Sequence, residues 1–292
     1  MTTQEACKLV KSGNSVIFGG NALRAHPMVV IRELIRQKIN DLHVVGFANG
    51  LDLDILVGAG CVKKVSSAYI GLEVFGLAPN FRRAVEKEGL EVVDYPEIIE
   101  RFVAAAWGMP FVPNLDLFGT DTLNRHKEIK IGTSPLSGEK YAALPPAHAD
   151  VAIIHAPMGD KYGNILYKQR KLMTTEEDLW FSRCADKLIV SVERIVDHKY
   201  VRRNPHMNMI PHYRTDAVVW APYGSHPGAF DYFYDYDRPH LEQYVEAAKT
   251  PETFKNYLAK YVYGVKDHDE YLNEVGPVMR LLQLQNAEVF FL

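Results

Sequence analysis

The chain has 292 residues, 47% of them hydrophobic and 24% charged, a balance typical of globular proteins that excludes a largely disordered or collagen-like chain. Lys and Arg number 33 and Asp and Glu 36, and the net charge of −3 argues against nucleic acid as a partner, because a phosphate backbone needs a positive surface. The three cysteines are far apart and include no C-x-x-C pair, which indicates neither a disulfide framework nor a zinc site and fits a reducing cytoplasm.

A membrane or secretory role is not expected. No segment holds the ~18 consecutive apolar residues that a membrane-spanning helix needs. Residues 1–6 are polar and acidic where a signal peptide would be basic and then apolar. We therefore expect a cytoplasmic protein with no membrane partner.

Strands and helices are expected to alternate along most of the chain. Thr2 and Glu5 form a capping-box pattern, which predicts a helix over residues 2–10, and the apolar run 15–18 before two glycines predicts a buried strand. Further strands are expected at 42–46, 62–70, 90–93, 151–154, 187–192 and 217–220, and further helices at 27–36, 80–89, 97–107 and 175–184. Strands separated by helices need crossover connections, so the pattern predicts an α/β fold with an open, largely parallel sheet and helices on both faces.

The composition changes at two places. Residues 120–146 are rich in Gly, Ser, Thr, Pro and charge, which favours an excursion or a short hairpin. After residue 228 the chain becomes aromatic and acidic, and three helical patterns follow near 241–248, 253–263 and 270–284. We therefore expect an α/β domain over residues 1–228 and a helical C-terminal extension over residues 229–292, packed on the core or on a partner.

The first candidate binding element is the turn after the first strand. Gly19, Gly20 and Asn21 lead to the helix that Pro27 opens, and glycines let the backbone approach a ligand closely. Free N–H groups and the helix dipole favour negative charge there, so the turn can hold a carboxylate, a thioester oxygen or a phosphate. It matches neither G-x-G-x-x-G nor the P-loop, which disfavours dinucleotide and nucleotide binding. A simple tight turn explains these residues about equally well.

Two more polar loops follow apolar strands. Gly163 and Asn164 lie in a loop over residues 156–164, and His226 lies in a loop over residues 221–227. Ligands of open α/β sheets bind beyond the carboxyl ends of strands, and a histidine can act as an acid or base near neutral pH. The alternatives are a connecting turn and a histidine that bonds a loop carbonyl.

Three acidic residues are candidates for chemistry. Glu97 starts a helix, Glu193 ends a strand, and Asp121 follows Thr120 in a Gly-Thr-Asp loop. A carboxylate in a partly dry cleft becomes more basic and can serve as a nucleophile or base. The alternatives are a helix N-terminal charge for Glu97, an ion pair for Glu193 and a turn cap for Asp121. The histidines lack metal-ligand spacing, so no metal site is predicted.

Taken in chain order, these motifs resemble those of family I CoA-transferases. The resemblance rests on residues 16–21 with 27–35, 104–113 leading to 119–121, 159–164, 190–196 and 216–227, and it covers roughly residues 5–230. The chain is similar to the alpha subunit of the glutaconate CoA-transferase type.

This resemblance implies an open α/β fold, a homologous beta subunit in an assembly that is usually α2β2, a site between unlike chains, and a coenzyme A thioester as substrate with no permanently bound cofactor. In that family a glutamate, normally on the beta subunit, attacks the acyl-CoA and passes CoA to an acceptor carboxylate. The resemblance thus makes Glu193 a structural residue. The residues expected to contact substrate or CoA are Gly19, Gly20, Asn21, Thr120, Asp121, Gly163, Asn164 and His226.

Two alternatives differ in class. The chain also resembles the alpha subunit of steroid ring-opening CoA-thioester hydrolases, whose working glutamate lies on that subunit, and Glu97 ahead of Arg101 is the nearest match. The spacing to the following alanines is shorter, however, and Asn114 begins a stretch where an arginine is expected, so a transferase is favoured. The other alternative is a non-catalytic binding or assembly subunit.

Overall fold

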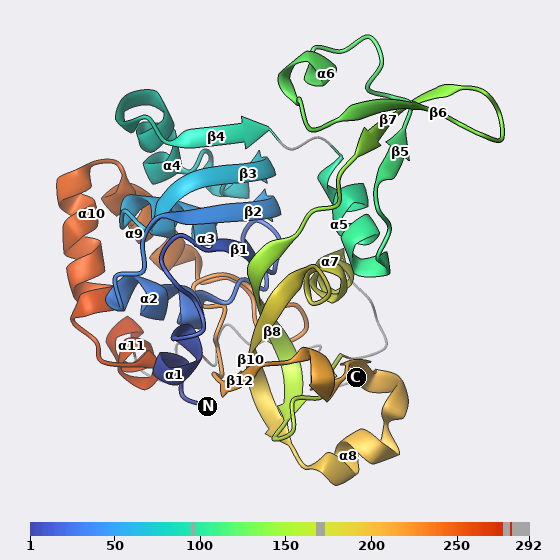
Figure 1. Cartoon of the computed structure of the whole chain (residues 1–292). Coiled ribbons are helices and arrows are strands. Elements are labelled where there is room, and N and C mark those ends of the chain that lie inside the picture. The colour runs from blue at the N-terminus through green and yellow to red at the C-terminus, as the bar shows by residue number, and fades with distance from the viewer. Residues whose placement is uncertain (95–96, 168–172, 277–280, 282–292) are drawn as a thin grey trace.

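The structure is a computed structural model that describes residues 1–94, 97–167, 173–276 and 281. Within this part of the chain the main sheet has nine strands (Figure 1). Its parallel strands lie in the order β4-β3-β2-β1-β8-β10-β12, and β9 and β11 add antiparallel pairs beside the far end of β8. The strands are β1 (Ser15–Phe18), β2 (Leu42–Asn49), β3 (Val62–Ile70), β4 (Glu91–Asp94), β8 (Ala149–Asp160), β9 (Ile165–Leu166), β10 (Ala185–Val196), β11 (Asn208–Ile210) and β12 (Ala217–Trp220).

The strand order reverses between β1 and β8. The chain builds outward from β1 through β2, β3 and β4, then restarts at β8 on the other side of β1 and continues through β10 and β12. Ligands of open α/β sheets bind outside the carboxyl ends of strands at such a reversal. The residues that follow β1 occupy this position, and the Gly19 N–H donates to the carbonyl oxygen of Ile153 in β8 at 2.8 Å.

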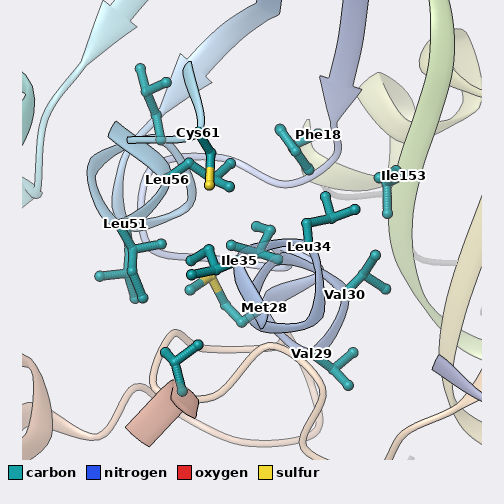
Figure 2. Packing of buried hydrophobic residues seen from close by; sticks show 14 of the residues in the cluster. Phe18, Met28, Val29, Val30, Leu34, Ile35, Leu51, Leu56, Cys61 and Ile153 are labelled. Atoms are coloured by element: carbon teal, nitrogen blue, oxygen red, sulfur yellow. The ribbon is translucent and has the colours of Figure 1, made fainter. Parts of the chain in front are cut away.

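Helices cover both faces of the sheet because successive strand residues point to opposite sides. Phe18 of β1 packs with α2 (Met28–Arg36) and α3 (Leu51–Gly58) on one face (Figure 2). Ile17 packs on the other face with α5 (Ile98–Trp107) and α7 (Met173–Phe181). There the rings of Phe102 and Phe181 meet edge to face with their centroids 4.8 Å apart. The predicted fold class is confirmed.

The remaining helices are short and lie around the sheet. Thr2 caps the first of them with the predicted capping box, in which the Glu5 N–H donates to Thr2 Oγ1 and the Thr2 N–H donates to the Glu5 carboxylate. These helices are α1 (Thr3–Cys7), α4 (Pro79–Arg83), α6 (Thr122–Arg125), α8 (His198–Arg203), α9 (Arg238–Ala248), α10 (Pro251–Leu258) and α11 (His268–Val275). No helix in the described ranges is long and apolar enough to cross a membrane.

Two expectations about the elements are wrong. Helix α3 was not predicted, because it is buried on all sides and its apolar residues mark no single face. The loop expected over residues 156–164 is mostly strand: Ala156 pairs with Val192 and Asp160 with Val196, so β8 continues to Asp160. Pro157 and Gly159 are typical loop residues, but long-range pairing with β10 overrides that local signal.

Residues 112–144 form an arm that projects from the core (Figure 1). It is an antiparallel sheet of β5 (Val112–Asn114), β7 (Lys140–Leu144) and β6 (Lys130–Thr133), in that order. The hairpin allowed by the sequence is therefore present, and β5 adds a third strand to it. The arm has a small cluster of its own, formed by Leu117, Ile129, Ala142 and Leu144.

The C-terminal helices pack on the core beside α2 and α3 (Figure 1). Tyr244 and Phe254 belong to the same hydrophobic cluster as those helices, and Tyr244 donates to the buried Asp54 of α3 at 2.6 Å. The last predicted helix begins at His268 and is described to Val275, and most of its expected remainder lies outside the described residues. A domain boundary after residue 228 stays a prediction.

Candidate active site at the strand-order reversal

The glycine turn, residues 19–22, is held from below by a histidine. Gly20 has φ +91°, and a methyl group there would collide with the Arg24 carbonyl oxygen, so the turn requires glycine. The ring of the buried His26 lies beneath the turn, with Nδ1 2.7 Å from the Gly19 oxygen and Nε2 3.0 Å from the Ala22 oxygen. The turn is therefore rigidly shaped before any ligand arrives.

Two of the predicted binding loops lie together at this place. The Ala229 N–H donates to the Leu23 oxygen at 2.9 Å, and the Ala25 N–H donates to the Ala229 oxygen at 2.8 Å. The loop after β12 also accepts a bond at Gly224 from the Val29 N–H of α2. These bonds join the loop that contains His226 to the segment that follows the glycine turn.

His226 itself is enclosed. It is fully buried, with Nδ1 2.8 Å from the Tyr271 hydroxyl and Nε2 3.1 Å from Asp237 Oδ2. Its carbonyl oxygen accepts from Arg32, whose guanidinium also stacks on the Tyr271 ring. The structure therefore places this side chain between the sheet and the C-terminal helices, and its contact with substrate stays a prediction.

A buried carboxyl pair on α7 closes the other side of the glycine turn. The Gly20 N–H donates to Asp178 Oδ1 at 3.2 Å, and Asn21 Nδ2 lies 3.5 Å from Glu177 Oε1. The Tyr167 hydroxyl lies 3.4 Å from Asp178 Oδ2. Burial raises the pKa of Glu177 to about 7 and raises the pKa of Asp178 well above its ordinary value. These residues were not predicted, because acidic residues in the first turn of a helix are common.

Glu193 lies at the centre of a polar network beneath the loops. Its Oε1 accepts from the Tyr234 hydroxyl at 2.8 Å and lies 2.8 Å from His155 Nε2, and its Oε2 accepts from the Tyr223 N–H at 2.9 Å. The His155 ring also lies 2.8 Å from the Ser191 hydroxyl. Both Ser191 and His155 are fully buried, so this Ser-His-Glu chain is inaccessible to a substrate. Glu193 has the surroundings of a structural residue, although its partners are not the arginines considered from the sequence.

Glu97 stands at the same edge of the sheet, beyond β4. It precedes α5 with φ +50° and ψ +42°, a conformation that costs a non-glycine residue about 1–3 kcal/mol. Partial burial raises the pKa of Glu97, and Glu100 and Asp116 add to the increase. Because β4 lies three strand positions from β1, Glu97 is on the order of 14 Å from the glycine turn along the sheet edge.

The second predicted loop lies elsewhere. Asn164 donates to Asp160 through Nδ2 and its backbone N–H, both at 2.9 Å, and His198 Nδ1 lies 2.8 Å from the same carboxylate. Gly163 has φ +102° in this tight turn. Since β8 runs on for six residues beyond the level of the glycine turn, Gly163 and Asn164 lie roughly 20 Å away from it.

Thr120 and Asp121 lie on the exposed arm. The Thr120 hydroxyl donates to the Leu117 oxygen at 2.8 Å, and Asp121 precedes α6 without a side-chain capping bond. The chain alone therefore gathers Gly19, Gly20 and Asn21 with the His226 loop, and leaves the other predicted residues dispersed. Among the described residues, no group of three or more His, Cys, Asp or Glu side chains could hold a metal ion.

The family model for coenzyme A transferase matches residues 1–221. The chain belongs to this family. It is 35% identical to the alpha-type chain of glutaconate CoA-transferase from Acidaminococcus fermentans, an alignment that covers 98% of this chain and 94% of the relative. The crystal structure of that enzyme superposes with a TM-score of 0.91 and 34% identity over 98% of this chain and 95% of the matched chain. The predicted family and the resemblance to alpha subunits are confirmed.

Two further members of the family bear on function. The chain is 31% identical to the IpdA subunit of a cholesterol ring-cleaving hydrolase from Rhodococcus jostii, over 91% of this chain and 93% of that one. It is 39% identical over 99% of its length to an uncharacterised protein of Archaeoglobus fulgidus, but spans only 64% of the length of that protein.

Proposed function

We propose that this chain is the alpha subunit of a heteromeric enzyme that moves coenzyme A between an acyl-CoA and a carboxylic acid. The observation that carries the proposal is the match to glutaconate CoA-transferase, which extends over nearly the whole of both chains. We place the substrates at the glycine turn, because it lies where the strand order reverses. The enzyme works in the cytoplasm, where three buried thiols stay reduced.

A homologous beta subunit completes the site, in an α2β2 assembly. Within the described residues, the substrate-facing loops are split between the sheet edge and the projecting arm. A second chain seated there would close the gap and exclude water, which a reactive anhydride or enzyme thioester requires.

The reaction conserves the thioester. A carboxylate oxygen of the beta-subunit glutamate attacks the acyl carbonyl, and the CoA thiolate leaves to give a mixed anhydride. The thiolate then attacks the glutamyl carbonyl and releases the original acid. The acceptor carboxylate reverses these two steps with a different acyl group. Glu193 is unsuited to the first attack because both of its oxygens are engaged.

A trapping experiment tests this proposal. The chain is co-purified with its homologous partner, incubated with an acyl-CoA and treated with borohydride, and the modified glutamate is located by mass spectrometry. We expect the label on the partner and CoA transfer that survives Glu97→Gln. Absence of any adduct with a competent acyl-CoA, in the assembled complex, would contradict the transferase assignment.

The hydrolase alternative is favoured by Glu97. Its raised pKa and left-handed conformation are typical of a carboxylate adapted to act as a base, and the chain aligns with a ring-cleaving hydrolase subunit. In that case Glu97→Gln abolishes C–C bond hydrolysis of a cyclic CoA thioester and no adduct forms on either chain. Glu100→Gln, which removes an exposed carboxylate of the same helix, is the matched control.

A further inference from the structure

The carboxyl pair of α7 has no electrostatic partner. Glu177 and Asp178 are each 1% exposed, and no basic side chain in the described part of the chain lies within ion-pair distance of either. Glu177 Oε2 is buried and makes no hydrogen bond. An unsatisfied buried polar atom costs about 1–3 kcal/mol, so packing alone does not account for the pair.

We propose that Asp178 and Glu177 are positioning residues that hold Gly20 and Asn21 of the glycine turn in place at the site proposed above. The inference rests on that proposed function for its consequence in catalysis, whereas the geometry that supports it belongs to this chain alone.

Asp178 and the glycines fit one another. Asp178 Oδ1 accepts from the Gly20 N–H, and a methyl group on Gly19 would collide with that same oxygen and crowd Ile154. Loss of the carboxyl group would free the Gly20 amide and open space beside Gly19. The turn would then lose the contact that fixes it on the side opposite His26.

Glu177 acts on the next residue along the turn. Its Oε1 lies 3.5 Å from Asn21 Nδ2, at the limit of a hydrogen bond, while Oε2 is open. A protonated Glu177 can therefore steady the Asn21 amide and still present a donor at the turn. An ionised Glu177 would add a negative charge beside Asp178 without any neutralising cation.

The charge state makes the arrangement dependent on pH. The titratable groups that face the pair are Tyr167 on one side and, across the turn, His26 with Asp52 at 3.4 Å. Because burial raises the pKa of Glu177 to about 7, both carboxyls are protonated below neutral pH and Glu177 ionises above it. We expect the turn to loosen, and transfer activity to fall, as the pH rises through about 7.

The experiment uses the full chain in complex with its homologous partner. Hydrogen–deuterium exchange of the peptide that covers residues 19–24 reports the turn directly, and kcat and KM are measured from about pH 5.5 to 8.5. The variants are Asp178→Ala, Asp178→Asn, Glu177→Ala and Glu177→Gln. The control is Glu176→Gln, an exposed carboxylate on the same helix.

Asp178→Ala is expected to speed exchange in this peptide about tenfold and to lower kcat more than it changes KM, because a misplaced turn costs mainly rate. Asp178→Asn keeps an acceptor for the Gly20 N–H and should recover most of the protection. Glu177→Gln stays neutral and should remove the decline in activity above pH 7, whereas Glu177→Ala should lower activity at every pH. Glu176→Gln should resemble the wild type.

The two proposals fail separately. Unchanged exchange in Asp178→Ala and Glu177→Ala overturns the positioning role, whatever the activity. Faster exchange in both, together with a wild-type complex that transfers no CoA from any acyl-CoA, upholds the positioning role and overturns the proposed function. If Asp178→Ala does not fold, Asp178→Asn and the two Glu177 variants decide, and a Glu177→Gln profile that declines like the wild type overturns the part played by ionisation.

Discussion

The glycine turn and the arm differ in what holds them. The turn lies among buried residues, and bonds from β8, α7, His26 and the loop after β12 converge on the segment around it. The arm has a cluster of four buried side chains and leaves large apolar ones exposed: Leu115, Phe118, Ile131 and Leu136. A cavity of about 370 Å³ opens beside the stacked rings of Phe111 and Tyr141. The fold of this chain thus completes the turn, whereas the arm is the region with surface to spare for another molecule.

The largest expected contrast is between two glycines with similar dihedral angles. Gly20→Ala places a methyl group against the Arg24 carbonyl at φ +91° and should destabilise the chain by about 3 kcal/mol or more. Gly119→Ala, at φ +84° on the arm with open space around it, should cost about 1 kcal/mol. Urea unfolding of both variants measures the difference. Equal losses would show that dihedral strain alone matters and that the turn is no more tightly packed than the arm.

A hydroxyl beneath the loops provides the next test. Tyr234→Phe removes a donor to Glu193 and the acceptor of the Ser225 N–H in a buried network, so a loss of about 2 kcal/mol is expected. Tyr213 is 77% exposed, and Tyr213→Phe should change stability by less than about 0.5 kcal/mol. Thermal and urea unfolding give both values. A Tyr234→Phe variant as stable as Tyr213→Phe would mean that water replaces the hydroxyl and that the network is open.

The dependence of stability on pH should show the buried carboxyl pair. A carboxyl group whose pKa is raised on folding binds protons more tightly in the folded state, so stability falls as pH rises from the ordinary value of 4.5 to about 7. Glu177→Gln removes this fall, and its advantage over the wild type should grow across that window to on the order of 1 kcal/mol. Glu176→Gln should show no such growth. Parallel unfolding curves for wild type and Glu177→Gln at every pH would contradict burial of the Glu177 carboxyl in solution.

The strands, the glycine turn and the family were predictable because their signals are local. An apolar run before Gly19 and Gly20 marks both a buried strand and a tight turn. The end of β8 was not predictable in that way, since pairing with β10 decides it against Pro157 and Gly159.

The site was only partly predictable, since long-range contacts decide its surroundings. The polypeptide returns along β9 before α7 brings Glu177 and Asp178 to the turn, and nothing in a Glu-Glu-Asp run indicates that contact. His226 looks available in the sequence, but Asp237 and Tyr271 from the C-terminal segment enclose it. Sequence spacing gives the order of loops along the chain and not the packing against them.

The smallest effect is expected at the tip of the arm. Leu136 is 96% exposed, so Leu136→Ser removes no burial on folding and should change the free energy of unfolding by less than about 0.5 kcal/mol. Leu144→Ala, which empties a fully buried position of the same arm, should cost about 2–5 kcal/mol and serves as the positive control. Urea unfolding at several protein concentrations measures both variants. A Leu136→Ser loss that grows with protein concentration would show that the tip is covered by another chain in solution, and the arm would then be as fully packed as the turn.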